Sequence, residues 1–220
     1  MINPASFRNL LFDFDGTLID SWSLHDAAFR SVLQEEQPVL LRQFDYELFR
    51  GLSTADVFRR LGIVGEAEIS RLSAEKQMHY RRLVNGGQLS PLPGALELLQ
   101  ASVGSGHRLF LVTSGSRVSV NAALTALEWL DIFEGVISAD DVKQGKPSPE
   151  GFLLCLQRYG LVNTESIVFE DAEAGVVAAR AANLSIAGVN NRGIESIVDR
   201  FFADLTILRT AVAGKSVEAM

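Results

Sequence analysis

Short apolar runs that stop at polar turns constrain the fold of this 220-residue chain more than any other feature of its sequence. The clearest runs lie at residues 10–12, 109–112, 135–137 and 167–169, with a weaker fifth at 186–189. Apolar runs of this length are typical of strands buried on both faces of a sheet. Helical patterns separate them, for example at residues 95–99, 120–127 and 152–159. This alternation predicts an α/β fold with a Rossmann-like open parallel sheet, built from right-handed crossovers.

Residues 21–89 interrupt the alternation of strands and helices. Three helical patterns follow one another there with no convincing strand between them. The pairs Gly86-Gly87 and Pro93-Gly94 are typical of a linker that returns to the sheet. We therefore expect an α-helical cap domain at residues 21–89, inserted into an α/β core formed by residues 1–20 and 90–220.

The composition argues against several classes of partner. The formal net charge is -7 and the basic residues are scattered, so the electrostatic footprint of a nucleic-acid-binding protein is missing. No segment has the continuous apolar length of a membrane span, and the start lacks a charged leader followed by an apolar stretch. The single cysteine, Cys155, lies in an apolar run and suits a reducing compartment. We expect a cytoplasmic protein with no nucleic-acid or membrane partner; its oligomeric state stays open, and a monomer is compatible with the sequence.

Acidic side chains follow two of the expected strands. Asp13 and Asp15 come directly after the first run, and because they are two residues apart in extended chain they point to the same side. Glu170 and Asp171 follow the run at 167–169. Carboxylates gathered at strand ends are costly unless they are paired, and Mg²⁺ is the economical partner for oxygen ligands.

The other strand ends carry groups that suit a phosphate. Residues 113–117 read Thr-Ser-Gly-Ser-Arg, which makes Thr113, Ser114, Gly115 and Arg117 candidates for contacting phosphoryl oxygens. Lys146, in the next turn, adds a cation. Each feature alone is also typical of an ordinary turn or of a solvated lysine.

Taken together, these motifs resemble those of the haloacid dehalogenase superfamily. They are residues 13–18 (Asp-Phe-Asp-Gly-Thr-Leu), Thr113, Lys146-Pro147 and Glu170-Asp171, in this order and each at the end of an expected strand. The resemblance covers nearly the whole chain, including the insertion after the first motif, which is the cap type of β-phosphoglucomutase and its phosphatase relatives. Dehalogenases and phosphonate-cleaving members lack a carboxylate at the position of Asp15, so phosphate-ester chemistry is favoured.

The resemblance implies a role for each motif residue. Asp13 would be the nucleophile that forms an aspartyl-phosphate, and Asp15 the general acid and then the base. Thr113 would hydrogen-bond a phosphoryl oxygen, and Lys146 would offset negative charge. Mg²⁺ would be held by Asp13, Asp15 through its backbone carbonyl, and Asp171, with Glu170 as a direct or water-mediated ligand.

The expected cap offers weaker candidates for contacting substrate. His25 follows the first motif where several relatives carry a histidine near the hinge, although a surface histidine is an equal alternative. Arg50 and Gly51 resemble the start of a loop by which such caps touch substrate, with a solvated arginine as the alternative. Lys76 lies within a helical pattern where a solvated position is expected.

These expectations define a function and its rivals. The main hypothesis is a Mg²⁺-dependent phosphatase acting on a small phosphorylated metabolite, such as a sugar or polyol phosphate or phosphoglycolate. The first alternative is a phosphomutase of the β-phosphoglucomutase type, which Thr17 and the uncharged Thr54 disfavour. The second is a noncatalytic binding or regulatory domain, which a complete set of motif residues disfavours.

Overall fold

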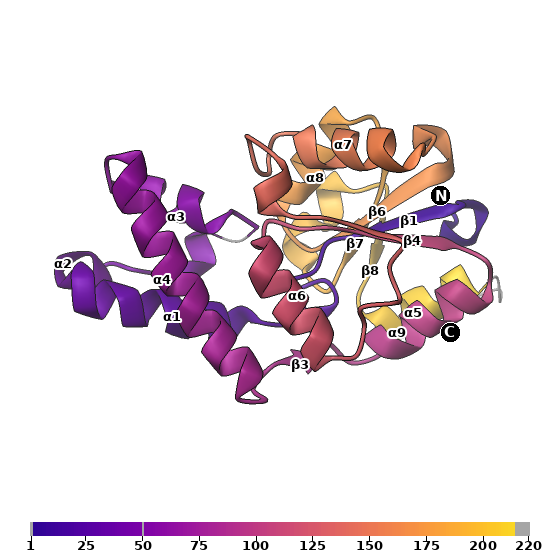
Figure 1. The fold of residues 1–220 in the computed structure, drawn as a ribbon. Helices are drawn as coiled ribbons and strands as arrows, with labels where there is room; N and C mark the ends of the chain where they lie inside the picture. Colours follow the sequence, from indigo (N-terminus) through magenta and orange to yellow (C-terminus); the bar gives the residue numbers. More distant parts are fainter. Residues whose placement is uncertain (1, 50, 214–220) are drawn as a thin grey trace.

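A six-stranded sheet forms the centre of the protein, and every neighbouring pair of its strands runs parallel (Figure 1). The computed structural model describes residues 2–49 and 51–213. The strand order is β5-β4-β1-β6-β7-β8, so the chain moves outward from β1 on one side and returns to its other side with β6. Such a reversal of strand order leaves a crevice beyond the carboxyl ends of the central strands.

The five strands expected from the apolar runs are confirmed. They are β1 (Asn9–Phe12), β4 (Arg108–Val112), β5 (Gly135–Ile137), β6 (Ser166–Glu170) and β7 (Ser185–Val189). The edge strand β8 (Arg200–Phe202) and the pair β2 (Ile19–Asp20) and β3 (Ser90–Pro91) were not expected from the sequence. These strands have two or three residues, too few to show a periodic pattern.

Helices cover both faces of the sheet because alternate strand residues point in opposite directions. Leu10 and Phe12 belong to one buried cluster and Leu11 to another. The first cluster includes residues of α5 (Ala95–Gly104), α6 (Arg117–Ala126) and α9 (Leu205–Val212). The second includes residues of α7 (Glu150–Tyr159) and α8 (Glu173–Ala181). The parallel sheet is therefore buried between two helical layers.

The insertion forms a separate helical lobe beside the sheet (Figure 1). Its helices are α1 (Trp22–Glu36), α2 (Pro38–Leu41), α3 (Thr54–Arg60) and α4 (Glu66–Asn85). They enclose a third apolar cluster that includes Phe29, Phe58 and Leu72. Within residues 2–49 and 51–213, no helix combines the length and the apolar character that crossing a membrane requires.

The two connections between the lobes lie side by side. β2 leads into the helical lobe and β3 leads out of it, and they pair antiparallel through Ile19 with Pro91 and Asp20 with Ser90. The chain therefore enters and leaves the insertion through one two-stranded ribbon. This ribbon begins four residues beyond Asp15, so the helical lobe is joined to the core close to the carboxyl end of β1.

Candidate active site

Three buried carboxylates meet at the carboxyl ends of β1 and β6. The parallel pairing of these strands places Phe12 beside Phe169, and the Asp13 amide donates to the Phe169 carbonyl at 3.0 Å. Ligand oxygens of Asp13, Glu170 and Asp171 all lie within 4.8 Å of one another. The register of two strands far apart in sequence therefore gathers the acidic residues of two motifs.

Lys146 joins two of these carboxylates. Its ammonium group donates to Asp13 Oδ1 and to Glu170 Oε1, both at 2.5 Å. Burial opposes the charge of Lys146, but Asp13 and Glu170 together raise its pKa above the ordinary value. Burial, followed by repulsion from Glu170, raises the pKa of Asp13 well above its usual range despite the attraction of Lys146. The single positive charge of Lys146 thus balances only part of the negative charge of the three carboxylates.

Two glycines allow the carboxylates to approach the backbone closely. A Cβ at Gly16 would lie 2.4 Å from Asp171 Oδ2, and this residue also has a φ of +85°. A Cβ at Gly175, in the first turn of α8, would lie 1.7 Å from Glu170 Oε1. Glu170 Oε2 instead accepts from the backbone amides of Asp171 and Ala172, at 3.0 and 3.2 Å. The acidic cluster therefore depends on a close fit that any side chain at position 175 would disrupt.

The donor set fits a hard divalent cation. Asp13, Glu170 and Asp171 provide only oxygen ligands, which are the ligands of Mg²⁺. All three are buried, and ionised carboxylates in such a place are costly without a balancing charge. The raised pKa of Asp13 reports the same imbalance. These residues could therefore hold Mg²⁺.

Asp15 belongs to a second chain of polar groups that extends into the helical lobe. Its Oδ1 accepts from the Ser21 hydroxyl at 2.5 Å and lies 2.9 Å from His25 Nε2. On the other side of the ring, Lys76 Nζ lies 2.5 Å from His25 Nδ1. We assign the His25 proton to Nε2, so that Lys76 donates to Nδ1 and the ring donates to Asp15.

The expectation that Lys76 is solvated was wrong. Its exposed fraction is 2%, and its ammonium group lies 4.6 Å from the centre of the Phe29 ring and 5.3 Å from that of Tyr80. Periodicity placed Lys76 on α4 correctly but could not show that α1 packs against this part of α4 with a histidine. A long-range partner, absent from the local pattern, makes burial of the lysine possible.

Burial and neighbouring groups together set the pKa values of Lys76, His25 and Asp15. Burial lowers the pKa of Lys76 to about 7, although the charge of Asp15 opposes the shift. Burial and the neighbouring charge of Lys76 lower the pKa of His25 against the attraction of Asp15. For Asp15 burial acts the other way, yet His25, the Ser21 hydroxyl and Lys76 bring its pKa below the ordinary value. Asp15 is therefore held as a carboxylate.

Some residues of the turn after β4 face the cavity, and others bind to the core away from it. The Thr113 hydroxyl accepts from the Gly115 amide at 3.0 Å, and Ser114 and Gly115 face the cavity next to Asp13. Arg117 turns away: its guanidinium donates to the Val136 carbonyl at 3.0 Å and pairs with Asp141. The structure therefore brings Ser114 and Gly115, but not the Arg117 side chain, to the cavity.

We call the cavity above Asp13 and Asp15 the inner pocket. Its volume is about 250 Å³, and its walls include Gly16, His25, Lys76 and Asn190 together with three aromatic residues of the helical lobe, Trp22, Phe29 and Tyr46. An aromatic wall opposite carboxylates suits a ligand with one apolar face and one polar end.

Gly51, a residue of the helical lobe, lines the inner pocket where this lobe meets the core. Its carbonyl accepts from the Ser114 hydroxyl at 2.9 Å, which links the two lobes. With a φ of +75°, it packs so closely that an added Cβ would lie 2.9 Å from the Cβ of Ala172. Arg50, the other loop residue expected to contact substrate, lies outside the described residues.

Several residues that shape the site were not recognised in the sequence. Asn190 donates from Nδ2 to the carbonyls of Gly16 and Thr17, at 2.9 and 3.1 Å, and Asn191 donates to the Asp171 carbonyl at 2.8 Å. Both asparagines directly follow β7. Their position after the weak fifth apolar run was the available signal, since polar residues at strand ends mark this edge of the sheet.

Comparison with known proteins identifies the family. A family model described as haloacid dehalogenase-like hydrolase matches residues 10–189. Fructose-1-phosphate phosphatase YqaB of Escherichia coli is 33% identical over 189 residues, which are 83% of this chain and 96% of that protein. Validoxylamine A 7'-phosphate phosphatase of Streptomyces hygroscopicus subsp. limoneus is 31% identical over 217 residues, covering 96% of this chain and 100% of the relative. The crystal structure of β-phosphoglucomutase from Clostridium difficile has a TM-score of 0.79 at 25% identity and covers 92% of this chain and 93% of its own. This chain belongs to the haloacid dehalogenase-like hydrolase family.

Proposed function

We propose that the protein is a Mg²⁺-dependent phosphatase that hydrolyses a sugar or polyol phosphate through an aspartyl-phosphate on Asp13. The observation that carries this proposal is the arrangement of two aspartates at the end of β1. Asp13 lies beside Lys146 and the acidic cluster, whereas Asp15 lies beside Ser21 and His25. Asp13 thus lies beside groups that suit the binding of a phosphoryl group, and Asp15 lies beside groups that change its pKa.

Two steps account for hydrolysis. In the first, a carboxylate oxygen of Asp13 attacks phosphorus, the bond to the ester oxygen breaks, and the departing alcohol takes a proton from Asp15. Asp15 is a carboxylate in the free protein and takes up this proton when substrate binds, because the negative charge of the bound phosphate raises its pKa. In the second, Asp15 takes a proton from water as that water attacks phosphorus, and phosphate leaves Asp13. The hydrogen bonds from Ser21 and His25 favour the carboxylate form of Asp15 that the second step requires.

The scaffold provides the remaining groups. Lys146 offsets negative charge on Asp13 and on the transferring group, and Ser114 and Gly115 line the inner pocket next to Asp13. We propose that Asp13, Asp171 and the backbone carbonyl of Asp15 hold Mg²⁺, with Glu170 as a direct or water-mediated ligand. When bound, Mg²⁺ would neutralise charge and orient phosphoryl oxygens.

We further propose that residues 21–89 act as a cap that admits the substrate and then excludes water. The ribbon of β2 and β3 and the hydrogen bond from Ser114 to Gly51 support two hinged lobes that meet over the inner pocket. The E. coli relative named as a fructose-1-phosphate phosphatase supports a phosphorylated sugar as the substrate. The cytoplasmic location stays a prediction.

The test measures phosphate release from a panel of sugar and polyol phosphates with Mg²⁺. We expect turnover that is lost in chelator and restored by added Mg²⁺. Asp13→Asn should abolish turnover while thermal unfolding stays close to that of the wild type, because the amide keeps the shape but cannot form the acyl-phosphate. Substantial turnover by Asp13→Asn would refute the nucleophile. Interconversion of β-glucose 1-phosphate and glucose 6-phosphate faster than any phosphate release would instead support the phosphomutase.

A further inference from the structure

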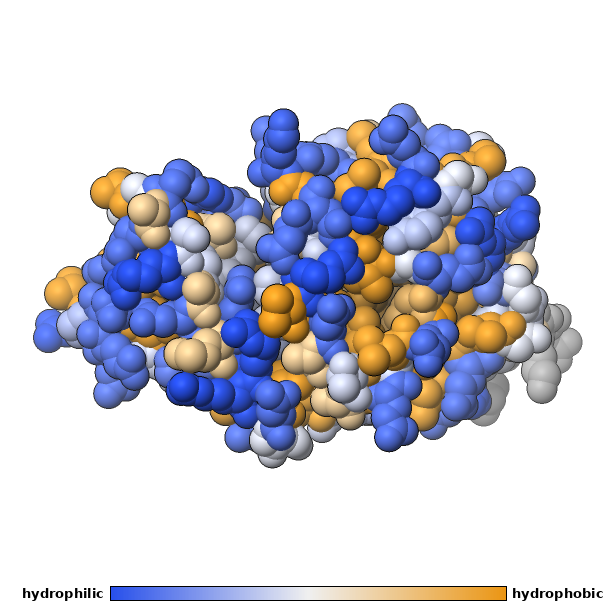
Figure 2. Space-filling view, viewed as in Figure 1, coloured by the Kyte–Doolittle hydropathy of each residue, from blue (hydrophilic) through white to orange (hydrophobic). Residues whose placement is uncertain are grey.

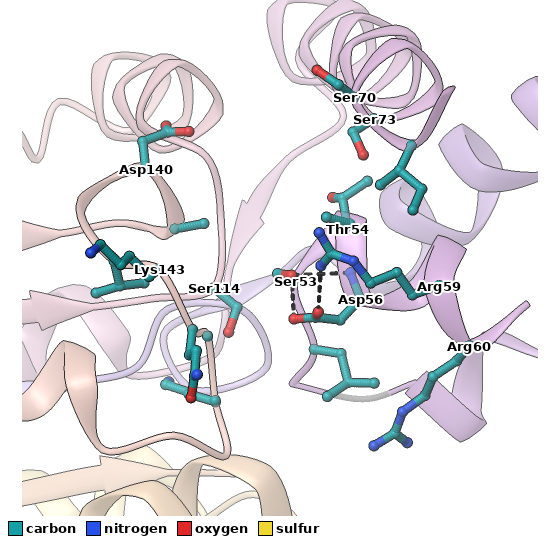
Figure 3. A pocket seen from close by; sticks show the side chains of 18 of the residues that line it. Ser53, Thr54, Asp56, Arg59, Arg60, Ser70, Ser73, Ser114, Asp140 and Lys143 are labelled. Carbon is teal, nitrogen blue, oxygen red and sulfur yellow. Dashed lines mark hydrogen bonds and ion pairs between the residues drawn. The ribbon is translucent and has the colours of Figure 1, made fainter. Parts of the chain in front are cut away.

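A large polar groove lies beside the inner pocket, on the other side of the loop at residues 51–54. Its volume is about 850 Å³, more than three times that of the inner pocket. One wall comes from α3 and α4 of the helical lobe, and the other from core residues 139–147 (Figure 3). In the space-filling view, a hollow separates the two lobes at the upper edge of the molecule (Figure 2). We call this cavity the outer groove.

The two cavities meet at a narrow partition. Leu52, Thr54 and Ser114 line both of them. Ser114 also bonds to Gly51 across the partition, so the wall consists of one loop of the helical lobe resting on one turn of the core. A ligand held in the inner pocket therefore needs to extend past only a few side chains to enter the outer groove.

The wall formed by α4 is unusually polar for a helix face directed at another lobe. Ser70, Ser73, Ala74 and Gln77 occupy this face at helical spacing. Figure 3 shows the hydroxyls of Ser70 and Ser73 directed toward the space between the lobes. Helix faces that pack against a neighbour are normally apolar, so these small polar side chains line a hollow instead of filling it.

Ser73 provides an independent sign that the groove binds a ligand. The residue is 9% exposed, and its hydroxyl has no hydrogen-bond partner among the described residues. A buried hydroxyl without a partner is unfavourable, because it has lost water and gained nothing in exchange. The Ser73 Oγ is itself almost fully covered, and rotation of its side chain toward the groove would let a ligand hydroxyl supply the missing partner.

The charges of the groove favour a neutral ligand. Lys146 reaches the groove but is already paired with Asp13 and Glu170. The remaining charged lining residues are three basic and three acidic: Arg59, Arg60, Lys143, Asp56, Glu66 and Asp140. Arg59 is itself paired with Asp56 and Glu66. A second phosphate would meet as many negative groups as positive ones, whereas sugar hydroxyls can both donate to and accept from such a lining.

We propose that the outer groove is a second substrate subsite that binds a neutral sugar ring attached to the phosphorylated sugar. This inference rests on the proposed phosphatase function and names its substrate class: glycosylated sugar phosphates with two rings. The phosphorylated ring occupies the inner pocket, and the second ring passes over Thr54 and Ser114 into the groove. Hydrogen bonding to Ser73 contributes to recognition of that ring.

The test compares glucose 6-phosphate with three phosphates that add a second glucose to it: trehalose 6-phosphate, maltose 6'-phosphate and cellobiose 6'-phosphate. For the wild type we expect kcat/KM for at least one two-ring phosphate to exceed that for glucose 6-phosphate by about tenfold, as a few good contacts allow. Ala74→Trp fills the groove and should remove this preference by lowering kcat/KM for the two-ring phosphate far more than kcat/KM for glucose 6-phosphate. Ala67→Trp, on the same helix but outside the groove, is the matched control.

A second variant tests Ser73 directly. Because its hydroxyl has no partner among the described residues, Ser73→Ala should leave thermal stability unchanged or slightly raised. We expect KM for the favoured two-ring phosphate to rise about fivefold, the value of one hydrogen bond, with kcat unchanged. A merely structural role for Ser73 would not separate KM from kcat in this way.

The outcomes separate the inference from the function on which it rests. Turnover of glucose 6-phosphate that equals or exceeds turnover of all three two-ring phosphates would overturn the subsite. An Ala74→Trp effect no larger than that of Ala67→Trp would overturn it as well. By contrast, no Mg²⁺-dependent phosphate release from these sugars or from p-nitrophenyl phosphate would refute the phosphatase itself.

Discussion

Two buried lysines flank the two aspartates of the first motif, and their surroundings give them opposite properties. Lys146 is 7% exposed and lies between the carboxylates of Asp13 and Glu170. Lys76 is 2% exposed and lies against the His25 ring and two aromatic faces. The carboxylates raise the pKa of Lys146, whereas burial lowers the pKa of Lys76 to about 7.

The difference shows that burial alone does not decide the charge of a lysine. Carboxylates in direct contact outweigh desolvation, but a neutral imidazole and aromatic rings do not. Lys146 is therefore a fixed positive charge, suited to a group that gathers negative charge during phosphoryl transfer. Lys76 can gain or lose a proton near neutral pH, and it is linked to Asp15 by the His25 ring, which contacts both residues.

Replacing each lysine by methionine should give the largest effects on activity, and the two losses should differ in size. Lys146→Met removes the cation beside Asp13, so we expect kcat/KM to fall about 1000-fold, the upper range for one electrostatic group in an active site. Lys76→Met removes a group that acts through His25, so we expect a fall of about tenfold. Phosphate release from the best substrate measures both. Equal losses would break the distinction between the two lysines.

The controls for this pair address folding and surface charge. Lys143→Met changes an exposed lysine near the same cleft and should leave turnover of a one-ring phosphate close to that of the wild type. Circular dichroism should show native secondary structure for each variant. A loss of activity that follows a loss of structure would be discounted.

The stability of the protein should report the lowered pKa of Lys76. In the unfolded chain this lysine keeps its proton to about pH 10.4, whereas in the folded protein it releases the proton near pH 7. Between these values the unfolded state binds more protons, so the free energy of unfolding of the wild type rises with pH relative to Lys76→Met. We expect a difference of up to about 1.4 kcal/mol per pH unit.

Urea unfolding between pH 7.5 and 9.5 provides the measurement. His25 is neutral across this window because burial and Lys76 lower its pKa, which leaves Lys76 as the titrating member of the group. Asp15 stays ionised there because its pKa lies below the ordinary value. A gap between wild type and Lys76→Met that does not change with pH would show that Lys76 keeps an ordinary proton affinity.

Ser21→Ala should give the smallest effect. It removes one hydrogen bond to Asp15 and leaves the bond from His25 in place. Losing one such bond is worth about 1 kcal/mol, so we expect turnover to fall about fivefold. The pKa of Asp15 should rise, and with it the pH at which activity is lost on the acidic side. Ser31→Ala, in α1, which begins directly after Ser21, removes a hydroxyl that donates to the Ala27 carbonyl and is the control.

Local patterns predicted the sheet and the acidic end of the site. The runs before Asp13, Thr113 and Glu170 are buried strands, and parallel pairing is sufficient to bring their carboxyl ends to one edge. The helical insertion was also evident, because α1, α3 and α4 follow one another without a strand. What could be predicted therefore depends on sequence periodicity and on one topological rule.

Contacts between residues far apart in the sequence were beyond the reach of those patterns. Burial of Lys76 depends on the way α4 packs against α1, and the fit of Gly175 depends on the Glu170 side chain. Arg117 stood in a turn that suited a phosphate, yet nearby Asp141 and the Val136 carbonyl bind its guanidinium. In each case a partner defined only by the tertiary structure decided the role.

The contact between Gly51 and Ser114 has a consequence for how substrate preference can change. The core holds this loop through the main-chain carbonyl of Gly51. The positive φ of Gly51 and its close approach to Ala172 require a glycine at position 51 and a small residue at position 172. The neighbouring side chains of Leu52 and Thr54, which face both cavities, take no part in that attachment. Positions 52 and 54 can therefore be varied, in nature or in the laboratory, to select new substrates while the loop keeps its anchor.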